Sequence, residues 1–395
     1  MNIRFVFIFF LFFSGSSFWG QTQSWRLELA LNDRLYLPFF LHQTNKNEYV
    51  VINGDEQIKL KVSNKDKDTV ELQFVEMGTY LRFNHEDSIN IRGYWKDRKG
   101  ILYPLTGTKG EASRFIPILS GKPYSVSSSY QVVFGEKNQS WPAVGLFAQN
   151  EELITGTFLT ETGDYRFLEG NVFGNQLYLS CFDGAHAFVF TAKIKGDSLN
   201  GVFYSGSSYS TAWRGVINEN ANIGDPDSLT YVQDDNYELS KIQFRSLNGF
   251  KKRIDYAKNE LTIVQVMGSW CPNCLDETNY FKNLYSKYSE RGLEIIAIGF
   301  ESQKSRKKRR KHLKKFKQKA SIPYPVYLGG NASKKEASTK FSMLNEISSF
   351  PTTLFVNSKG EIIHVHTGFY GPGTGVYYDQ FKKSTESLIE PILQE

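Results

Sequence analysis

The sequence has few cysteines. Only Cys181, Cys271 and Cys274 occur among its 395 residues, whereas a small secreted scaffold held by disulfides would carry many more. No stretch beyond the N-terminal residues is long and apolar enough to span a bilayer. No Lys-Ser or Lys-Thr pair directly follows the glycine-rich segment Gly371–Gly375, which excludes a phosphate-binding loop there. Three cysteines in a chain of this size suggest one active pair and one bystander.

The first residues have the pattern of an export signal. Asn2 and Arg4 precede an apolar run, Phe5–Phe13, and the small residues Ser14–Ser17 follow it. This pattern predicts a secretory signal peptide over residues 1–20. An uncleaved membrane anchor is the less favoured alternative, because the run is about half the ~20 residues that span a bilayer. We therefore expect an exported protein of the periplasm or cell envelope, soluble after cleavage.

The composition is that of a globular protein of two or three domains, with 40% hydrophobic and 22% charged residues. The net charge of +6 is local, because Lys304–Lys319 holds eleven Lys or Arg residues and the rest of the chain is mildly acidic. We therefore expect no nucleic-acid partner. Leu313 and Phe316 give the basic segment an apolar edge, which favours an exposed helix between two strands. Peripheral contact with anionic surfaces is the alternative.

Residues 21–217 have the pattern of an all-β region. Trp25–Leu31 alternates with period two, as a half-buried strand does. Similar short runs recur with Asn-Gly, Gly-Asp or Gly-Asn pairs between them. From about residue 128, a small residue precedes an aromatic one by two positions on successive strands, which resembles a lipocalin- or avidin-like barrel. A meander or barrel and a sandwich both remain open, as does a division into two subdomains.

Residues 218–235 are polar and aperiodic, which predicts a linker. Residues 236–395 alternate strand and helix patterns and predict an α/β domain with helices on both faces of a central sheet. Strands are expected at 261–267, 293–300 and 324–328, with a hairpin at 353–356 and 362–366, and helices around 281–288, 304–319 and 378–393.

The segment Trp270–Cys274 carries the chemistry. It reads Trp-Cys-Pro-Asn-Cys and lies where a strand ends and a helix begins. In the first turn of a helix, Cys271 would face unpaired N–H groups and the positive end of the dipole, which stabilise a thiolate. A thiolate attacks a substrate disulfide, and Cys274 can resolve the mixed intermediate. Half of a zinc site is the alternative, but Cys181 is the only other cysteine.

Residues 236–395 resemble the thioredoxin-like superfamily, specifically its exported TlpA/ResA-like thiol–disulfide oxidoreductases. The resemblance is carried by Trp270–Cys274, the segment Phe350–Thr353 and the turn at Lys359-Gly360. It implies a cis Pro351 facing the cysteines, Cys271 as nucleophile and Cys274 as resolving thiol. The residue pattern alone favours a trans proline that opens an edge strand.

Two positions refine this resemblance. Gln265 stands where cytoplasmic thioredoxins carry a buried acid. Glu277 occupies the place where TlpA/ResA-like proteins carry a carboxylate, and as a partly buried group with a raised pKa it would take the proton of Cys274. The alternative is a first-turn Glu favoured by the helix dipole. The bulky Phe350 and the pair Pro272-Asn273 are expected to tune the redox potential.

Three further residues carry less specific patterns. His364 and His366 lie on one face of a strand but lack an obvious third ligand, so surface or packing roles are favoured and no metal site is expected. Cys181 stands among apolar residues and is expected to be a buried small hydrophobe. A regulatory or intermolecular disulfide is its alternative.

Together these patterns predict an extracytoplasmic thiol–disulfide oxidoreductase that reduces protein disulfides. It needs no cofactor beyond the Cys271–Cys274 disulfide, with Trp270 and Pro351 beside it, and depends on a periplasmic or membrane electron donor. The alternatives are the oxidase or isomerase direction, or a ligand- or copper-binding module with redox-sensing cysteines.

Overall fold

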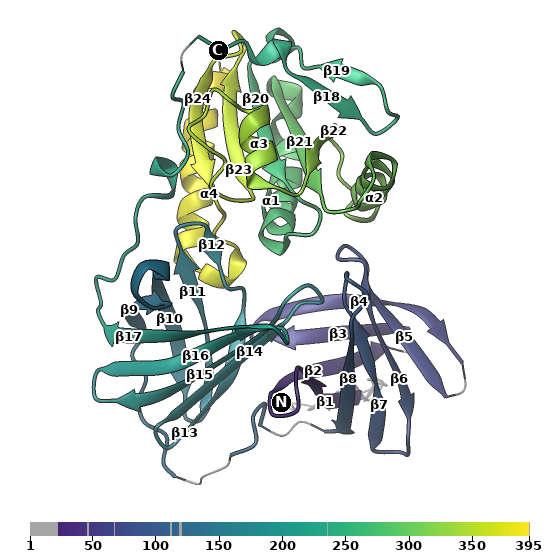
Figure 1. The fold of residues 1–395 in the computed structure, drawn as a ribbon, viewed down its shortest axis with the longest axis vertical. Coiled ribbons are helices and arrows are strands. Elements are labelled where there is room, and N and C mark those ends of the chain that lie inside the picture. The colour runs from purple at the N-terminus through teal and green to yellow at the C-terminus, as the bar shows by residue number, and fades with distance from the viewer. Residues whose placement is uncertain are drawn as a thin grey trace, which may run out of the picture.

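The computed structural model describes residues 23–394 apart from residues 46, 67, 111–112, 118–120 and 235. The predicted signal peptide lies outside the described residues. Figure 1 shows two β units below an α/β unit, whose sheet stands above them. The predicted combination of an all-β region and an α/β region is confirmed. In the described part of the chain, no helix is both long and apolar enough to cross a membrane.

The first β unit is a closed barrel of eight antiparallel strands in sequence order. Trp25, Leu27 and Leu29 point into its core at alternate positions of the first strand, as the period-two pattern predicts. The strands are β1 (Gln23–Ala30), β2 (Tyr36–Asn45), β3 (Glu48–Asn53), β4 (Glu56–Lys65), β5 (Thr69–Phe74), β6 (Thr79–His85), β7 (Asn90–Lys96) and β8 (Leu102–Lys109).

The second β unit is a nine-stranded sheet, and the pairing of β10 with β11 closes it on itself. Phe147, Phe158 and Phe203, the recurrent aromatics of the sequence, all lie in its core. The predicted barrel is therefore confirmed. Its strands are β9 (Ser129–Phe134), β10 (Trp141–Asn150), β11 (Leu153–Thr160), β12 (Gly163–Asp164), β13 (Leu168–Phe173), β14 (Gln176–Phe182), β15 (Ala187–Lys195), β16 (Ser198–Ser205) and β17 (Tyr209–Ile217).

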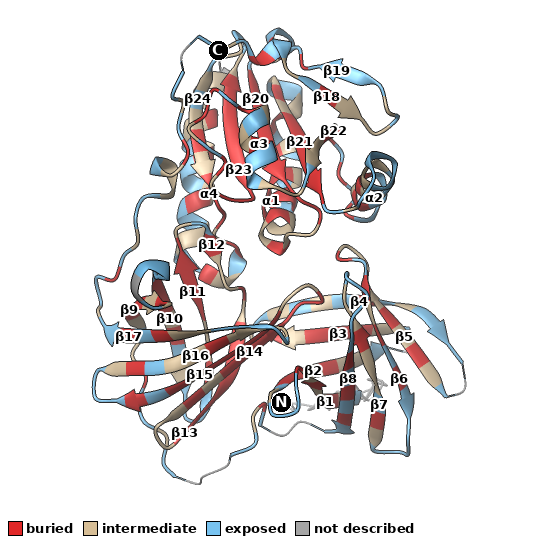
Figure 2. Cartoon of the chain, in the orientation of Figure 1, coloured by how far each residue is buried: buried red, intermediate tan, exposed pale blue. Residues whose placement is uncertain are grey.

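The C-terminal unit has a seven-stranded sheet in the order β19-β18-β22-β21-β20-β23-β24. Of its central strands, β20 is buried along its whole length and β21 at every position except Glu294 (Figure 2). The strands are β18 (Gln243–Ser246), β19 (Lys251–Arg253), β20 (Leu261–Met267), β21 (Leu293–Glu301), β22 (Val326–Asn331), β23 (Thr352–Asn357) and β24 (Ile362–Thr367). The helices are α1 (Pro272–Tyr288), α2 (Arg306–Lys319), α3 (Lys334–Lys340) and α4 (Val376–Ile389).

Proline explains two of the differences between the predicted and observed element boundaries. The strand expected from residue 324 begins at Val326, because Pro325 has no N–H to donate to a ladder. The last helix was expected to reach Leu393 but ends at Ile389, shortly before Pro391, because proline has no N–H to donate to the next helical hydrogen bond. The hairpin β18–β19 and the short helix α3 were not predicted.

The two barrels pack against each other through an aromatic contact. Phe182, at the end of β14, lies against Phe39, Phe74 and Trp95 of the first barrel, with ring centroids 4.5, 5.3 and 5.1 Å apart. Phe182 is fully buried and belongs to the core of the first barrel. The barrels therefore share apolar surface, which holds them in one arrangement.

Candidate active site

The two cysteines lie at the junction of β20 and α1. Cys271 is the N-cap of α1, and its sulfur accepts a hydrogen bond from the backbone N–H of Cys274 at 3.4 Å. Pro272 follows at the first helical position, where its missing N–H costs nothing. Both cysteines are free thiols in this structure; Cys274 is buried and Cys271 is half-buried. The sequence prediction that these residues stand in the first turn of a helix is confirmed.

The environments of the two thiols differ. Hydrogen bonds from the Cys274 thiol and the Cys274 N–H, together with the charge of Arg98, lower the pKa of Cys271 against the opposing effect of burial. Burial raises the pKa of Cys274 well above its ordinary value. Of the two thiols, the half-buried one of Cys271 is thus the more readily ionised.

A cis peptide bond joins Phe350 and Pro351, as the resemblance implied. It lies beside the cysteines, because the Cys271 sulfur is 3.5 Å from the carbonyl oxygen of Phe350. The ring of Phe350 packs edge-on against Trp270 at a centroid distance of 5.6 Å. The indole N–H of Trp270 in turn donates to the carbonyl of Phe300 at 2.8 Å. The rings of Trp270 and Phe350 therefore pack against each other beside the accessible sulfur of Cys271.

Glu277 is completely buried one turn after Cys274. Its two carboxyl oxygens accept hydrogen bonds from Thr353 Oγ1 at 2.7 Å and from Gln265 Nε2 at 2.8 Å. Burial raises its pKa to about 8 despite these bonds. Gln265 also donates to the carbonyl of Cys274 at 3.2 Å, so it ties the carboxyl group to the cysteine turn. A buried Glu with a raised pKa is what the first of the two sequence interpretations requires.

The sequence analysis missed a second buried carboxyl group, Glu301. It ends β21, which runs parallel to β20, and it accepts hydrogen bonds from the backbone N–H and the hydroxyl of Ser269 at 3.0 and 2.7 Å. Burial raises the pKa of Glu301 to about 7. The position at the carboxyl end of a buried strand was a usable signal, since such ends meet at one edge of a parallel sheet. Glu301 thus holds the loop that precedes Cys271.

Both barrels contact the cysteine turn. On the loop between β7 and β8, the Arg98 guanidinium donates to the carbonyl oxygen of Trp270. From the second barrel, the carbonyl of Asp164 accepts a hydrogen bond from Asn273 Nδ2 at 3.3 Å. Gly163, whose φ is 138°, lies directly against the Asn273 side chain. A Cβ added at Gly163 would be 2.5 Å from Asn273 Nδ2, which is too close for any other residue. Elements far from the motif in sequence therefore border the active site.

A buried ion cluster centred on Arg166 joins all three units. Its guanidinium contacts Asp276 on α1, Glu56 of the first barrel at 2.6 Å and Asp183 at 3.5 Å. Arg166 itself has φ 66°, which costs a residue with a Cβ about 1 kcal/mol. The ion pairs offset this strain and fix the cysteine helix against the barrels.

The predictions for two other segments are confirmed. Cys181 is fully buried in the core of the second barrel, where burial raises its pKa well above its ordinary value. The basic segment forms α2 between β21 and β22, capped by the Ser305 hydroxyl. Leu313 and Phe316 are its buried residues, while most of its basic side chains lie in solvent. Neither segment borders the cysteines.

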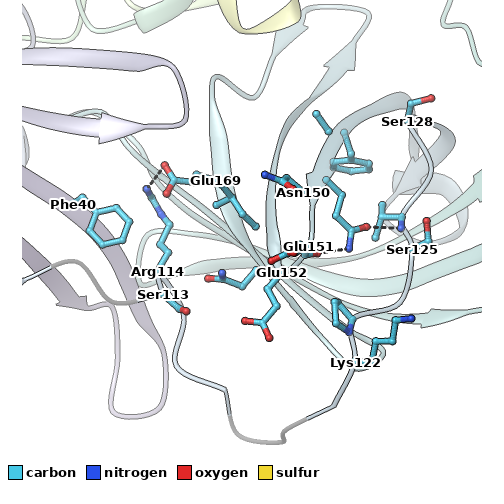
Figure 3. A pocket seen from close by; sticks show the side chains of 17 residues that line it. Phe40, Ser113, Arg114, Lys122, Ser125, Ser128, Asn150, Glu151, Glu152 and Glu169 are labelled. Carbon is cyan, nitrogen blue, oxygen red and sulfur yellow. Dashed lines mark hydrogen bonds and ion pairs between the residues drawn. The ribbon is translucent and has the colours of Figure 1, made fainter.

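A separate cavity of 1160 Å³ lies between the two barrels (Figure 3). Fully buried Arg114 lines it and pairs with Glu169 at 3.0 Å. The same guanidinium donates to Ser180 at 2.8 Å, to Asn53 at 2.9 Å and to the carbonyl of Ile52 at 3.1 Å. These partners belong to both barrels, so Arg114 joins the barrels across the cavity.

Residues 249–376 match the family model of Redoxin. The thiol–disulfide oxidoreductase ResA of Halalkalibacterium halodurans is 30% identical over 141 residues, 36% of this chain and 66% of that protein. ResA of Bacillus cereus is 25% identical over 155 residues, 39% of this chain and 76% of that protein. The chain thus spans about two thirds of the length of the first of these relatives.

Among solved structures, a putative thiol:disulfide interchange protein DsbE from Chlorobium tepidum is 14% identical. The match covers 41% of this chain and 99% of that one, with a TM-score of 0.32.

Proposed function

We propose that this chain, whose C-terminal part is a thioredoxin-like domain of the Redoxin family, is an exported thiol–disulfide oxidoreductase that reduces protein disulfides. One observation carries the proposal. The pKa of Cys271 is lowered while that of the neighbouring Cys274 is raised, and the buried carboxyl group of Glu277 lies one turn further along the helix. This is the arrangement that a two-step exchange between dithiol and disulfide needs.

In the first step, the Cys271 thiolate attacks one sulfur of the substrate disulfide. A bond forms between Cys271 and that sulfur, the substrate S–S bond breaks, and the other substrate sulfur leaves as a thiolate that takes a proton from water. The N–H of Cys274 and the charge of Arg98 support the attacking thiolate. The half-buried position of Cys271 leaves it accessible to the substrate.

In the second step, Cys274 resolves the mixed disulfide. Its thiol must first lose a proton, and the ionised form of Glu277 accepts it as general base. The resulting Cys274 thiolate attacks the Cys271 sulfur, the bond between Cys271 and the substrate breaks, and the second substrate thiolate leaves. The substrate gains two electrons and the protein gains the Cys271–Cys274 disulfide.

The proposed direction rests on the basicity of Cys274. A more basic thiolate is the stronger nucleophile, and the less basic thiol is the better leaving group. Because burial raises the pKa of Cys274 well above its ordinary value, an ordinary substrate thiol leaves in preference to it. The raised pKa of Cys274 therefore supports the reductase direction, whereas the lowered pKa of Cys271 favours the reduced protein, and the reduction potential of the pair gives the balance of the two effects.

A reductase of this kind needs a donor dithiol that returns the pair to its reduced form. With the export pattern of the first residues, which precede the described part, we place both the substrate and the donor outside the cytoplasm. The cis Pro351 segment and the rings of Trp270 and Phe350 border the accessible sulfur and would contact the substrate chain.

The test is the reduction potential of the pair, measured by trapping free thiols after equilibration with dithiol buffers of known potential. We expect a value near or below about −250 mV. A value of about −120 to −180 mV would instead assign an oxidase or isomerase direction. A pair that does not cycle would contradict the redox function itself.

Three variants accompany this measurement. Cys271→Ser is expected to abolish disulfide reduction, and Cys274→Ser is expected to accumulate mixed disulfides with substrate. Cys181→Ser is the matched control, since this thiol is buried in the second barrel and should leave the potential unchanged.

A further inference from the structure

Two histidines and an aspartate meet at the edge strand β24, on the side of the α/β unit away from β18 and β19. Asp227, from the segment that follows the second barrel, lies 2.5 Å from His366 Nδ1 and 3.2 Å from His364 Nε2 through its two carboxyl oxygens. The sequence offered no third ligand for the histidine pair, because Asp227 precedes it by more than a hundred residues. The folded chain supplies that ligand.

We propose that Asp227, His364 and His366 form a binding site for a divalent transition-metal ion of the Zn²⁺ type. Their ligand atoms all lie within 4.8 Å of one another. Ligands at about 2.0–2.2 Å from a tetrahedral ion stand roughly 3.3 Å apart, so small side-chain movements suffice to admit the ion. Two imidazoles and one carboxylate are a donor set that suits zinc.

The three side chains are held in place before any ion arrives. His364 and His366 alternate along β24, so both project from the same face of the strand. The His366 ring packs against Phe381 at 4.8 Å and the His364 ring against Phe355 at 5.4 Å. The backbone N–H of Asp227 donates to the side chain of Asp225 at 3.0 Å, which fixes the turn that presents the aspartate. Such preorganisation lowers the cost of binding.

The site also has room for a further ligand. A cavity of 220 Å³ lies against the three residues, and its other polar lining comes from Asp225 and from tyrosine, glutamine, serine and threonine side chains. The three candidate ligands are each partly accessible to solvent, with side-chain exposures of 35% for Asp227, 33% for His364 and 13% for His366. A water molecule can therefore complete the coordination of an ion with three protein ligands.

Binding there would fasten two parts of the chain together. Asp227 lies in the short helical turn Pro226–Ser228 between the second barrel and the α/β unit, and the histidines lie on the sheet of that unit. A bound ion would replace the contacts of Asp227 with His364 and His366 by three metal–ligand bonds. The expected role is a metal-dependent latch on the segment that joins the two units. It does not depend on the redox function proposed above.

Zinc titration calorimetry on the full chain tests the site. Thiolates also bind zinc, so the titration uses a Cys271→Ser/Cys274→Ser variant, which removes the thiols of the redox pair from competition. We expect one Zn²⁺ per chain. Loss of one direct ligand should weaken binding by more than about 100-fold, since loss of an outer partner alone costs 10- to 100-fold. The variants are His364→Ala, His366→Ala and the isosteric Asp227→Asn, with His42→Ala as the matched control.

Two further readouts separate the latch from a simple hydrogen-bonded cluster. Co²⁺ added in place of Zn²⁺ should give the visible absorption of a tetrahedral site, and Asp227→Asn should remove it. Zn²⁺ should slow protease cleavage within residues 218–234 in the parent chain and leave Asp227→Asn unaffected. The proposal is overturned if Zn²⁺ does not bind, or if binding and protection persist unchanged in Asp227→Asn. Disulfide reduction by otherwise unmodified Asp227→Asn should match that of the unmodified chain.

Discussion

In the proposed mechanism, the carboxyl group of Glu277 sets the pH range in which Cys274 can resolve the mixed disulfide. Its pKa of about 8 means that it is mostly protonated at pH 7 and cannot then accept the Cys274 proton. Above pH 8 it is ionised and can accept it. We expect the rate of resolution of a mixed disulfide to rise with pH through about 8 and then level off. Glu277→Gln should lower that rate by about 100-fold and remove the rise.

The measurement is the decay of a preformed mixed disulfide at Cys271, followed by acid quenching and thiol alkylation from pH 6 to 10. Glu290→Gln, on the exposed turn after α1, is the matched control and should behave as the unmodified chain does. A Glu277→Gln profile that keeps the same rise near pH 8 would show that another group takes the proton.

Arg98 acts on the other thiol. Its charge lowers the pKa of Cys271, and its exposed position means that salt screens the effect. Arg98→Met should therefore slow alkylation of Cys271 at pH 7 by about threefold at low salt, a change expected for an exposed charge pair. The difference should shrink in 1 M salt. Lys99→Met is the control on the same loop; an equal effect there would point to loop disruption.

Residue-scale prediction from sequence worked where the chemistry is local. The spacing of Cys271 and Cys274 and the position of Glu277 one turn later are fixed by a single helix, so the sequence contains them. Arg98 and Asp227 carry no comparable signal. Each lies in a polar segment typical of loops, and its partners are more than a hundred residues away.

At the scale of elements, α2 is a highly charged helix held by two apolar side chains. Leu313 is fully buried and lies against Gly299 of β21, where an added Cβ would be 2.7 Å from its methyl carbon. Leu313→Ala should lower the free energy of unfolding by about 2–5 kcal/mol, because it leaves a cavity. Lys311→Ala on the same helix should change it by no more than about 0.5 kcal/mol. Urea denaturation measures both; equal values would contradict the assigned packing.

Elements with strong periodicity were predictable, and short ones were not. The spacing of Phe281, Leu284 and Tyr288 predicted α1, and each of these residues is buried. The helix α3 buries only Ala337 in seven residues, which leaves no apolar stripe to detect. In the hairpin β18–β19, the second strand consists of three exposed basic residues, so its pairing depends on neighbouring strands more than on its own sequence.

At the scale of the whole molecule, the sequence distinguished a β-rich part from an α/β part but not how they meet. The alternation of apolar and polar residues along a strand shows which face of the strand is buried, but it does not show which other part of the chain covers that face. Leu275, on the cysteine helix, packs against the core of the first barrel, and Ser349 Oγ lies 3.4 Å from the carbonyl of Thr162 in the second. These contacts place both barrels beside the cysteine turn, and we predict that they limit which substrates reach Cys271.

Arg166 provides the test of that arrangement. It pairs with Asp276 on the cysteine helix and with Glu56 and Asp183 of the barrels. Arg166→Met leaves three carboxylates close together without their shared cation, a change that typically costs about 3–5 kcal/mol for a buried pair. We expect the barrels to separate from α1 before the α/β unit unfolds. Cys271 should then react faster with a maleimide carrying a large polymer, while its reaction with a small maleimide changes little.

Arg92→Met is the matched control, because Arg92 pairs with Glu86 on the exposed surface of the first barrel. Its loss should leave both maleimide rates unchanged. If Arg166→Met also leaves the rate with the large reagent unchanged, the barrels do not restrict access to Cys271. If Arg166→Met raises the rate with the large maleimide and leaves the rate with the small one unchanged, the ion cluster keeps the barrels against the cysteine turn. Substrate size would then be selected by the β units and the exchange chemistry by the thioredoxin-like domain.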